Sequence, residues 1–242
     1  MESHKEVIIS MENGVRLVKF NRPHKKNAIS FNMYKIIIDI LNEDAKNDEV
    51  VLTVITGTGN YYSSGVDLKS KYFSSSQKPV SKKTNLYLQF IDAFIRYPKL
   101  LIAVVNGPAI GIAVTTLALC DVVYASDCAT FSTPFLNFSL PPEGCSSYMF
   151  PRIMGKTEEA LKFNFISKIF PHEHLENQIK ELLNYGMLNR TFITNCKKLI
   201  NNNIKNTLLE INLIEESAME ESYRSGAVTK SIKAYFNEKS KL

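Results

Sequence analysis

The sequence predicts an α/β fold whose strands are mainly parallel. Apolar runs at 50–56 and 100–105 are typical of buried strands, and each leads through a glycine turn towards a helical segment. The succession of strand, glycine turn and helix recurs three times, as expected for a parallel sheet covered by helices. The chain is 45% hydrophobic and 22% charged, which is ordinary for a globular protein with a sizeable core. We therefore expect a core of residues 1–155 followed by a helical region of residues 156–242.

The N-terminal elements follow from local signals. Residues 7–10 and 15–20 are expected to be strands, because Asn13-Gly14 between them favours a tight hairpin turn. Ser30 can cap a helix, since its hydroxyl can accept a backbone N–H at the helix start. The apolar residues behind this cap fall at helical spacing: Met33, Ile36, Ile37, Ile40 and Leu41.

The middle and the end of the chain continue this pattern. Residues 69–83 are rich in Ser and Lys and indicate a mobile surface loop, after which a helix is expected over 84–97, where Pro98 ends it. A turn at 106–108, a helix of small residues at 111–119 and a short strand at 122–125 follow. Behind Pro151 the chain becomes polar and helical. Five helices are expected there: 157–165, 172–185 with Gly186 as C-cap, 191–203, 207–223 and 228–237.

Composition and spacing argue against several classes of function. The net charge of +5 is modest and the lysines are scattered, so nucleic-acid binding is not expected. The nearly uncharged stretch 101–125 is broken by Asn106-Gly107-Pro108, which favours two buried elements over a membrane span. Neither the cysteines nor the histidines have the spacing of a metal site, and no phosphate-binding glycine motif is present.

The last three residues are Ser240-Lys241-Leu242. This tripeptide matches the address that the peroxisomal import receptor reads at a C-terminus. We therefore expect a location in the peroxisomal matrix, with the import receptor as a partner.

Glu143 is an isolated carboxylate in an apolar stretch. Between Leu100 and Pro151 the only other charged side chains are Asp121 and Asp127, so no Lys, Arg or His is nearby in sequence. A carboxylate on a Pro/Gly turn amid aromatic residues either reaches solvent or is desolvated, and desolvation raises its pKa. The second outcome makes Glu143 a candidate general base.

Two glycine turns can supply hydrogen-bond donors beside this base. They are Ser64-Gly65-Val66-Asp67 and Ile110-Gly111-Ile112-Ala113, and each follows a buried strand and opens towards a helix. N–H groups at helix starts lack partners within the helix, so two that converge can hold a developing oxyanion. With Glu143 as base, the combination predicts proton abstraction next to a carbonyl.

Four segments resemble the crotonase (enoyl-CoA hydratase/isomerase) superfamily and, more narrowly, the peroxisomal Δ3,Δ2-enoyl-CoA isomerases. They are residues 62–68, residues 103–112, Cys120-Asp121 and residues 142–147. The resemblance implies a spiral of ββα units with a helical C-terminal region that forms a homotrimer or hexamer. Because the chain passes almost directly from Phe165 to Ile166, this region is shortened relative to the family, which carries a further loop and helix there.

The resemblance also assigns residues to a site. The backbone N–H groups of Val66 and Ile112 would form the oxyanion hole, with Glu143 as the single catalytic acid/base. The basic turn 22–26 would lie near the CoA phosphates. The glutamate positions of the hydratases are occupied by Thr115 and Phe135, which argues against hydration. Substrate and CoA contacts would come from Tyr62, Ser63, Ser64, Gly65, Asp67, Leu68, Gly111, Lys25 and Lys69.

The implied activity is the isomerisation of cis- or trans-3-enoyl-CoA to trans-2-enoyl-CoA in the β-oxidation of unsaturated fatty acids. Glu143 would move a proton from C2 to C4 while the dienolate oxygen rests on the two N–H groups. No metal or redox cofactor is implied, since CoA is part of the substrate. One alternative stays open: a non-catalytic acyl-CoA-binding protein of the same fold that lost activity with the shortened C-terminal region.

Overall fold

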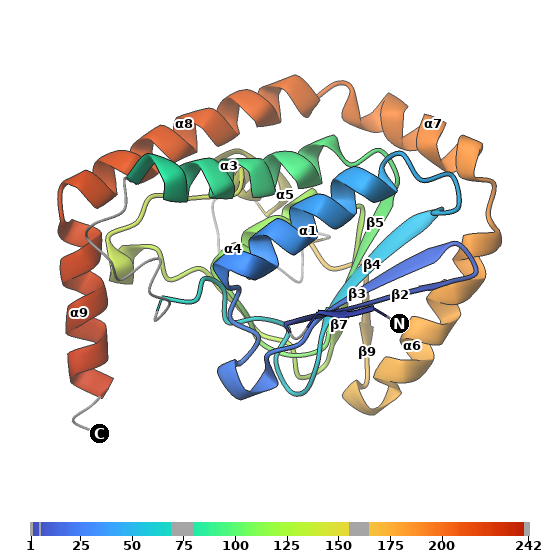
Figure 1. Ribbon diagram of the computed structural model, residues 1–242, viewed down its shortest axis with the longest axis horizontal. Coiled ribbons are helices and arrows are strands. Elements are labelled where there is room, and N and C mark those ends of the chain that lie inside the picture. The colour runs from blue at the N-terminus through green and yellow to red at the C-terminus, as the bar shows by residue number, and fades with distance from the viewer. Residues whose placement is uncertain (1, 5, 69–79, 155–164, 240–242) are drawn as a thin grey trace.

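The computed structural model describes residues 2–4, 6–68, 80–154 and 165–239. A seven-stranded sheet forms its centre, in the order β1-β2-β3-β4-β5-β7-β9 (Figure 1). The first three strands are antiparallel, and from β3 onward every neighbouring pair is parallel. The strands are β1 (Glu2–His4), β2 (Val7–Glu12), β3 (Val15–Phe20), β4 (Leu52–Gly57), β5 (Leu100–Val105), β7 (Val122–Ser126) and β9 (Lys168–Phe170). The predicted α/β class with a mainly parallel sheet is confirmed.

The central strands are buried on both faces because helices cover each side. On β5, Leu101 and Ala103 belong to the larger core, together with α1 (Phe31–Asp44) and α3 (Val80–Arg96). Ile102 on the same strand points to a smaller core that α6 (Leu175–Leu183) closes. Adjacent residues thus face opposite layers, as the period of a strand requires.

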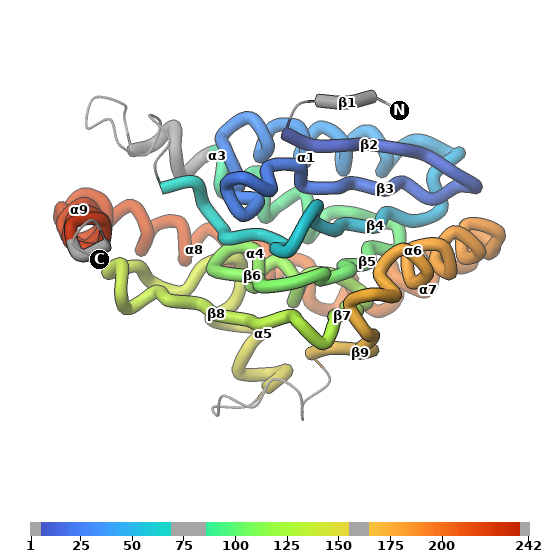
Figure 2. The backbone as a smooth tube through the Cα atoms, turned by 90° about the horizontal axis from the view of Figure 1, so that it is seen from below, coloured from blue at the N-terminus to red at the C-terminus, as the bar shows by residue number. Residues whose placement is uncertain are grey.

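The C-terminal helices wrap the core from end to end. α7 (Arg190–Asn201), α8 (Lys205–Arg224) and α9 (Ala227–Lys239) follow one another, and α8 runs across α3 (Figure 1). Seen from below, α9 lies at the end opposite to α6 and α7 (Figure 2). Within the described residues, no helix is both long and apolar enough to cross a membrane.

Several local predictions hold in the structure. Asn13 and Gly14 both have positive φ, 48° and 78°, as a two-residue hairpin turn requires. The Ser30 hydroxyl accepts the N–H of Met33 at 3.2 Å and caps α1. The carboxamide of Asn106 fixes the turn after β5 by accepting the N–H of Gly57 at 3.0 Å.

Other boundaries differ from the expectation. α3 begins at Val80, so residues 80–83 are helical, while 69–79 and most of the helix expected over 157–165 lie outside the described residues. The segment expected as one helix over 111–119 divides into α4 (Ile112–Thr115) and the 3-10 helix η2 (Thr116–Leu119). β6 (Ala109–Ile110), β8 (Phe131–Ser132) and α5 (Ser146–Ile153) were not expected.

The prediction that Gly186 ends a helix as its C-cap is wrong. α6 ends at Leu183, and Gly186 lies inside the 3-10 helix η6 (Asn184–Met187). A Cβ at Gly186 would stand 1.6 Å from the carbonyl oxygen of Asn13. The glycine is therefore required by close packing against the hairpin turn and not by a helix end.

Candidate active site

The two predicted glycine turns lie against each other. Ser63 forms a parallel bridge with Ala109, and the N–H of Ile110 donates to the Ser63 carbonyl at 3.0 Å. The Ser63 hydroxyl donates to the Asn27 carbonyl at 2.8 Å and accepts the N–H of Gly65 at 3.1 Å. Segments that are far apart in sequence are thereby joined at one edge of the parallel strands.

Positive φ values shape both turns. Gly65 has φ +79°, and a Cβ there would stand 2.5 Å from the carbonyl oxygen of Ile110; Gly111 has φ +59° and precedes α4. Among the described residues, neither the N–H of Val66 nor that of Ile112 has a backbone acceptor. Both groups can therefore bind an oxygen atom brought between the turns.

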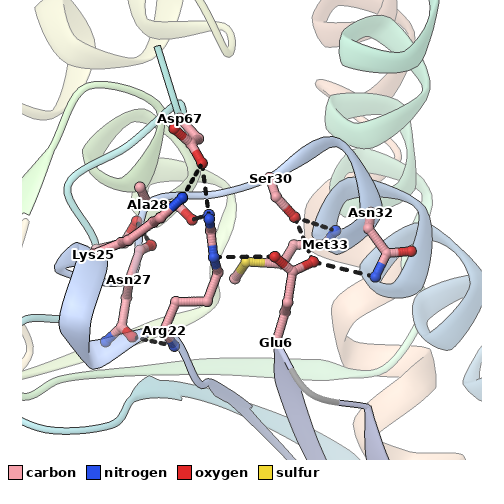
Figure 3. Close-up of polar contacts among 10 residues, drawn as sticks. Glu6, Arg22, Lys25, Asn27, Ala28, Ser30, Asn32, Met33 and Asp67 are labelled. Carbon is pink, nitrogen blue, oxygen red and sulfur yellow. Dashed lines mark hydrogen bonds and ion pairs between the residues drawn. The ribbon is translucent and has the colours of Figure 1, made fainter. Parts of the chain in front are cut away.

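A buried ion network holds the first turn from behind (Figure 3). The Arg22 guanidinium pairs with Asp67 at 2.9 Å and with Glu6 at 3.0 Å, and it donates to the carbonyl of Ala28 at 2.6 Å. Glu6 also accepts the hydroxyl of Ser30, so the network joins the residue before β2, the segment after β3, the start of α1 and the first turn (Figure 3). Arg22 and Asp67 are both only 6% exposed, so their ion pair braces the first turn from inside the protein, next to Val66. Contact of Asp67 and the basic turn 22–26 with CoA stays a prediction.

Glu143 lies buried beside the second turn, with 5% of its surface exposed. Its Oε1 is 4.0 Å from the place that a Cβ on Gly111 would occupy. Burial raises the pKa of Glu143 to about 8, and the charge of Glu215 adds to this, while the nearby Tyr87 hydroxyl lowers it in part. The carboxyl group is thus desolvated, as predicted, and poised for proton transfer near neutral pH.

The two turns and Glu143 open on one cavity of about 90 Å³. Aromatic and aliphatic side chains from several helices complete its wall, among them Phe31, Leu86, Tyr87, Phe138, Met219 and Tyr223. An apolar cavity with a few convergent polar groups is the usual form of a small-molecule site. The arrangement suits an apolar ligand whose carbonyl oxygen meets the N–H groups.

The structure brings together most of the predicted site residues. Seven of them line the cavity: Ser64, Gly65, Val66, Leu68, Gly111, Ile112 and Glu143. Tyr62 instead packs in the core against Phe20, with ring centroids 5.4 Å apart. Lys25 is half exposed with its Nζ 3.9 Å from Asp67, and Lys69 lies outside the described residues. Thr115 is buried behind the turn 144–145, and Phe135 lines the cavity, so neither position carries an acid.

Sequence reasoning missed three tyrosines and one glutamate around Glu143. Tyr34 of α1, Tyr87 of α3 and Tyr223 of α8 surround the carboxylate, and burial raises the pKa of each well above its usual range. They therefore remain neutral hydroxyl donors at any working pH. Glu215 of α8 is the fourth missed residue. Helical spacing alone marks all four as core positions, so no local signal distinguishes them.

The sequence is similar to those of enoyl-CoA isomerases. The model of the family described as Enoyl-CoA hydratase/isomerase matches residues 10–242. The Mus musculus protein named "Enoyl-CoA delta isomerase 3, peroxisomal" is 41% identical, over 98% of this chain and 80% of that protein. The Rattus norvegicus protein named "Enoyl-CoA delta isomerase 2" is 38% identical, over 100% of this chain and 66% of that protein.

Solved structures share the same architecture. A Pseudoalteromonas atlantica enoyl-CoA hydratase/isomerase superposes with a TM-score of 0.87 at 26% identity, covering 97% of this chain and 98% of that one. A Bacillus halodurans enoyl-CoA hydratase gives a TM-score of 0.84 at 20% identity, covering 95% and 99%, which speaks to the fold alone. The expected crotonase-like fold is confirmed.

Proposed function

The chain belongs to the enoyl-CoA hydratase/isomerase family, and we propose that it is an isomerase that converts 3-enoyl-CoA to trans-2-enoyl-CoA. The observation that carries this proposal is the buried Glu143 beside the Gly111 turn. The resemblance to the family places Thr115 and Phe135 at the positions of the two hydratase glutamates, which supports isomerisation over hydration. Isomerisation needs one group that removes a proton and returns it elsewhere. The names of the mouse and rat relatives support the same reaction.

In the proposed mechanism, the thioester oxygen accepts the N–H groups of Val66 and Ile112. Glu143 takes a proton from C2, and the electron pair of the broken C–H bond forms the C1=C2 bond of a dienolate while the C1=O π electrons move onto the thioester oxygen. The protonated Glu143 then delivers its proton to C4, where the C3=C4 electrons form the new C–H bond. The C1=C2 electrons become the C2=C3 bond, and the oxygen restores the C1=O bond. Preorganised donors hold the negative oxygen best where water is excluded, which the apolar cavity provides. Because these groups suffice, we propose that no metal or redox cofactor takes part.

The direct test is conversion of a 3-enoyl-CoA, followed spectrophotometrically beside a binding titration. We expect trans-2-enoyl-CoA to form, with no 3-hydroxyacyl-CoA even on prolonged incubation, and we expect treatment with a chelator to leave the rate unchanged. Binding without conversion would instead indicate an acyl-CoA-binding protein. Formation of the hydroxy product would point to a hydratase.

The rate should depend on pH through Glu143. The base must be ionised to accept a proton, and its pKa is raised to about 8, so most of it is protonated at lower pH. We therefore expect kcat/KM to rise with pH and to level off only above about 8. A profile that levels off near the ordinary glutamate value of 4.5 would contradict the assignment.

We also propose a peroxisomal location and a role in fatty-acid β-oxidation. The name of the mouse relative supports the location. The tripeptide 240–242 lies outside the described residues, so binding of the import receptor stays a prediction. Assembly into a homotrimer or hexamer also stays a prediction. Microscopy of a fluorescent fusion, with and without Ser240-Lys241-Leu242, tests the location.

A further inference from the structure

Glu215 is a second buried carboxylate near Glu143, and the proposed reaction does not use it. It lies on α8 and is 4% exposed. Its Oε2 accepts the backbone N–H of Cys145 at 2.7 Å, and its Oε1 accepts the N–H of Ser147 at 3.0 Å and the Ser147 hydroxyl at 2.5 Å. Burial raises the pKa of Glu215, whereas these three bonds lower it and favour the ionised form.

The turn that Glu215 holds has an unusual backbone. Gly144 and Cys145 are consecutive residues with positive φ, 65° and 62°. A Cβ on Gly144 would stand 2.5 Å from the Thr115 hydroxyl, so the turn is packed tightly from behind. Cys145 is the N-cap residue of α5, and its side chain makes no capping bond to this helix. The carboxylate from α8 therefore takes over the capping of α5 from outside.

We propose that Glu215 is a positioning residue for Glu143, because from α8 it holds the turn 144–147 and so directs the Glu143 carboxylate to the Gly111 turn. Glu143 directly precedes this turn, and the N–H of Ser146 donates to its carbonyl at 3.2 Å. A shift of the turn would therefore move the base. The catalytic consequence rests on the proposed function, but the placement of the two carboxylates does not.

The charge of Glu215 has a second effect on the base. Like charges disfavour joint ionisation, so Glu215 adds to the raised pKa of Glu143. The other described titratable groups around the pair are Tyr34 of α1, Tyr87 and Asp92 of α3, Cys145 at the start of α5, and Glu216 and Tyr223 of α8. No cation is among the described groups that shift the pKa of either carboxylate. The pKa of Glu143 is therefore raised mainly by burial and, after it, by the charge of Glu215.

A carboxyl ¹³C NMR titration of the free protein tests the electrostatic part without any need for turnover. The Glu143 resonance is identified by its loss in Glu143→Gln. In Glu215→Gln we expect its midpoint to fall by roughly one pH unit, as for removal of a neighbouring like charge. Glu210→Gln removes an exposed charge from the same helix and should leave the midpoint unchanged. An unchanged midpoint in Glu215→Gln would overturn the inference.

Glu215→Asp tests the positioning part, since it keeps the charge but shortens the side chain. We expect faster amide hydrogen exchange at Cys145 and Ser147, a roughly 10- to 10²-fold lower kcat with little change in KM, and a Glu143 midpoint that stays high. Ser147→Ala, a milder variant, should also speed exchange at Cys145. Unchanged exchange and kcat in folded Glu215→Asp would refute the positioning role. An inactive wild type would refute the proposed function, while titration and exchange would still decide on Glu215.

Discussion

Glu143→Gln is expected to lower kcat by roughly 10²- to 10⁴-fold while acyl-CoA binding is preserved. Glutamine has the same shape and fits the buried position, but its amide cannot accept the proton from C2. The Val66 and Ile112 N–H groups remain to bind the thioester, so the Kd should change little. Steady-state kinetics and a calorimetric titration with the same acyl-CoA measure both quantities. Glu173→Gln, an exposed substitution away from the cavity, is the control.

The same variant has a predicted signature in stability. The pKa of Glu143 is about 8 in the folded protein and 4.5 when unperturbed, so the folded state holds its proton more tightly. This contribution to stability is complete below pH 4.5 and is lost as the pH rises through 8. The melting temperature of Glu143→Gln minus that of the wild type should therefore increase as the pH is raised, because only the wild type loses this contribution. Near-wild-type turnover, or a difference in melting temperature that does not depend on pH, would contradict a buried titrating base.

The parts of the site that the sequence predicts are those with local signals. A glycine turn between a buried strand and a helix start marks both oxyanion segments, and the absence of nearby cations marks Glu143. Likewise, the hairpin dipeptide Asn13-Gly14 and the cap Ser30 act within a few residues and were found correctly.

The missed features depend on contacts between distant segments. Arg22 and Asp67 are 45 positions apart, and only the fold brings them together, so their buried ion pair could not be predicted from the sequence. Glu215 bonds to Cys145 from 70 positions away. α5 contains Pro151, a residue that disfavours helix interiors, yet packing against α8 stabilises this short helix. The first two features have no local signal in the sequence, and in the third a tertiary contact overrides a local preference.

Gly65→Ala is expected to reduce kcat by roughly 10²- to 10³-fold, the usual effect of losing one oxyanion donor. Its Cβ would stand 2.5 Å from the backbone oxygen of Ile110, and neither backbone can yield without separating the two turns. The N–H groups of Val66 and Ile112 would then no longer converge on one oxygen. The acyl chain still fits the apolar cavity, so kcat should fall more than KM rises.

Gly226→Ala separates this geometric effect from simple backbone strain. Gly226 has φ +75°, close to the +79° of Gly65, but no atom lies within 4 Å of its added Cβ. Both variants should lose roughly 1–2 kcal/mol of unfolding free energy from the left-handed conformation, with a further loss in Gly65→Ala from the clash. Only Gly65→Ala should lose activity. Denaturant unfolding and kinetics on both proteins measure this difference. If the two variants kept equal activity, the catalytic oxygen would not be bound between the two turns.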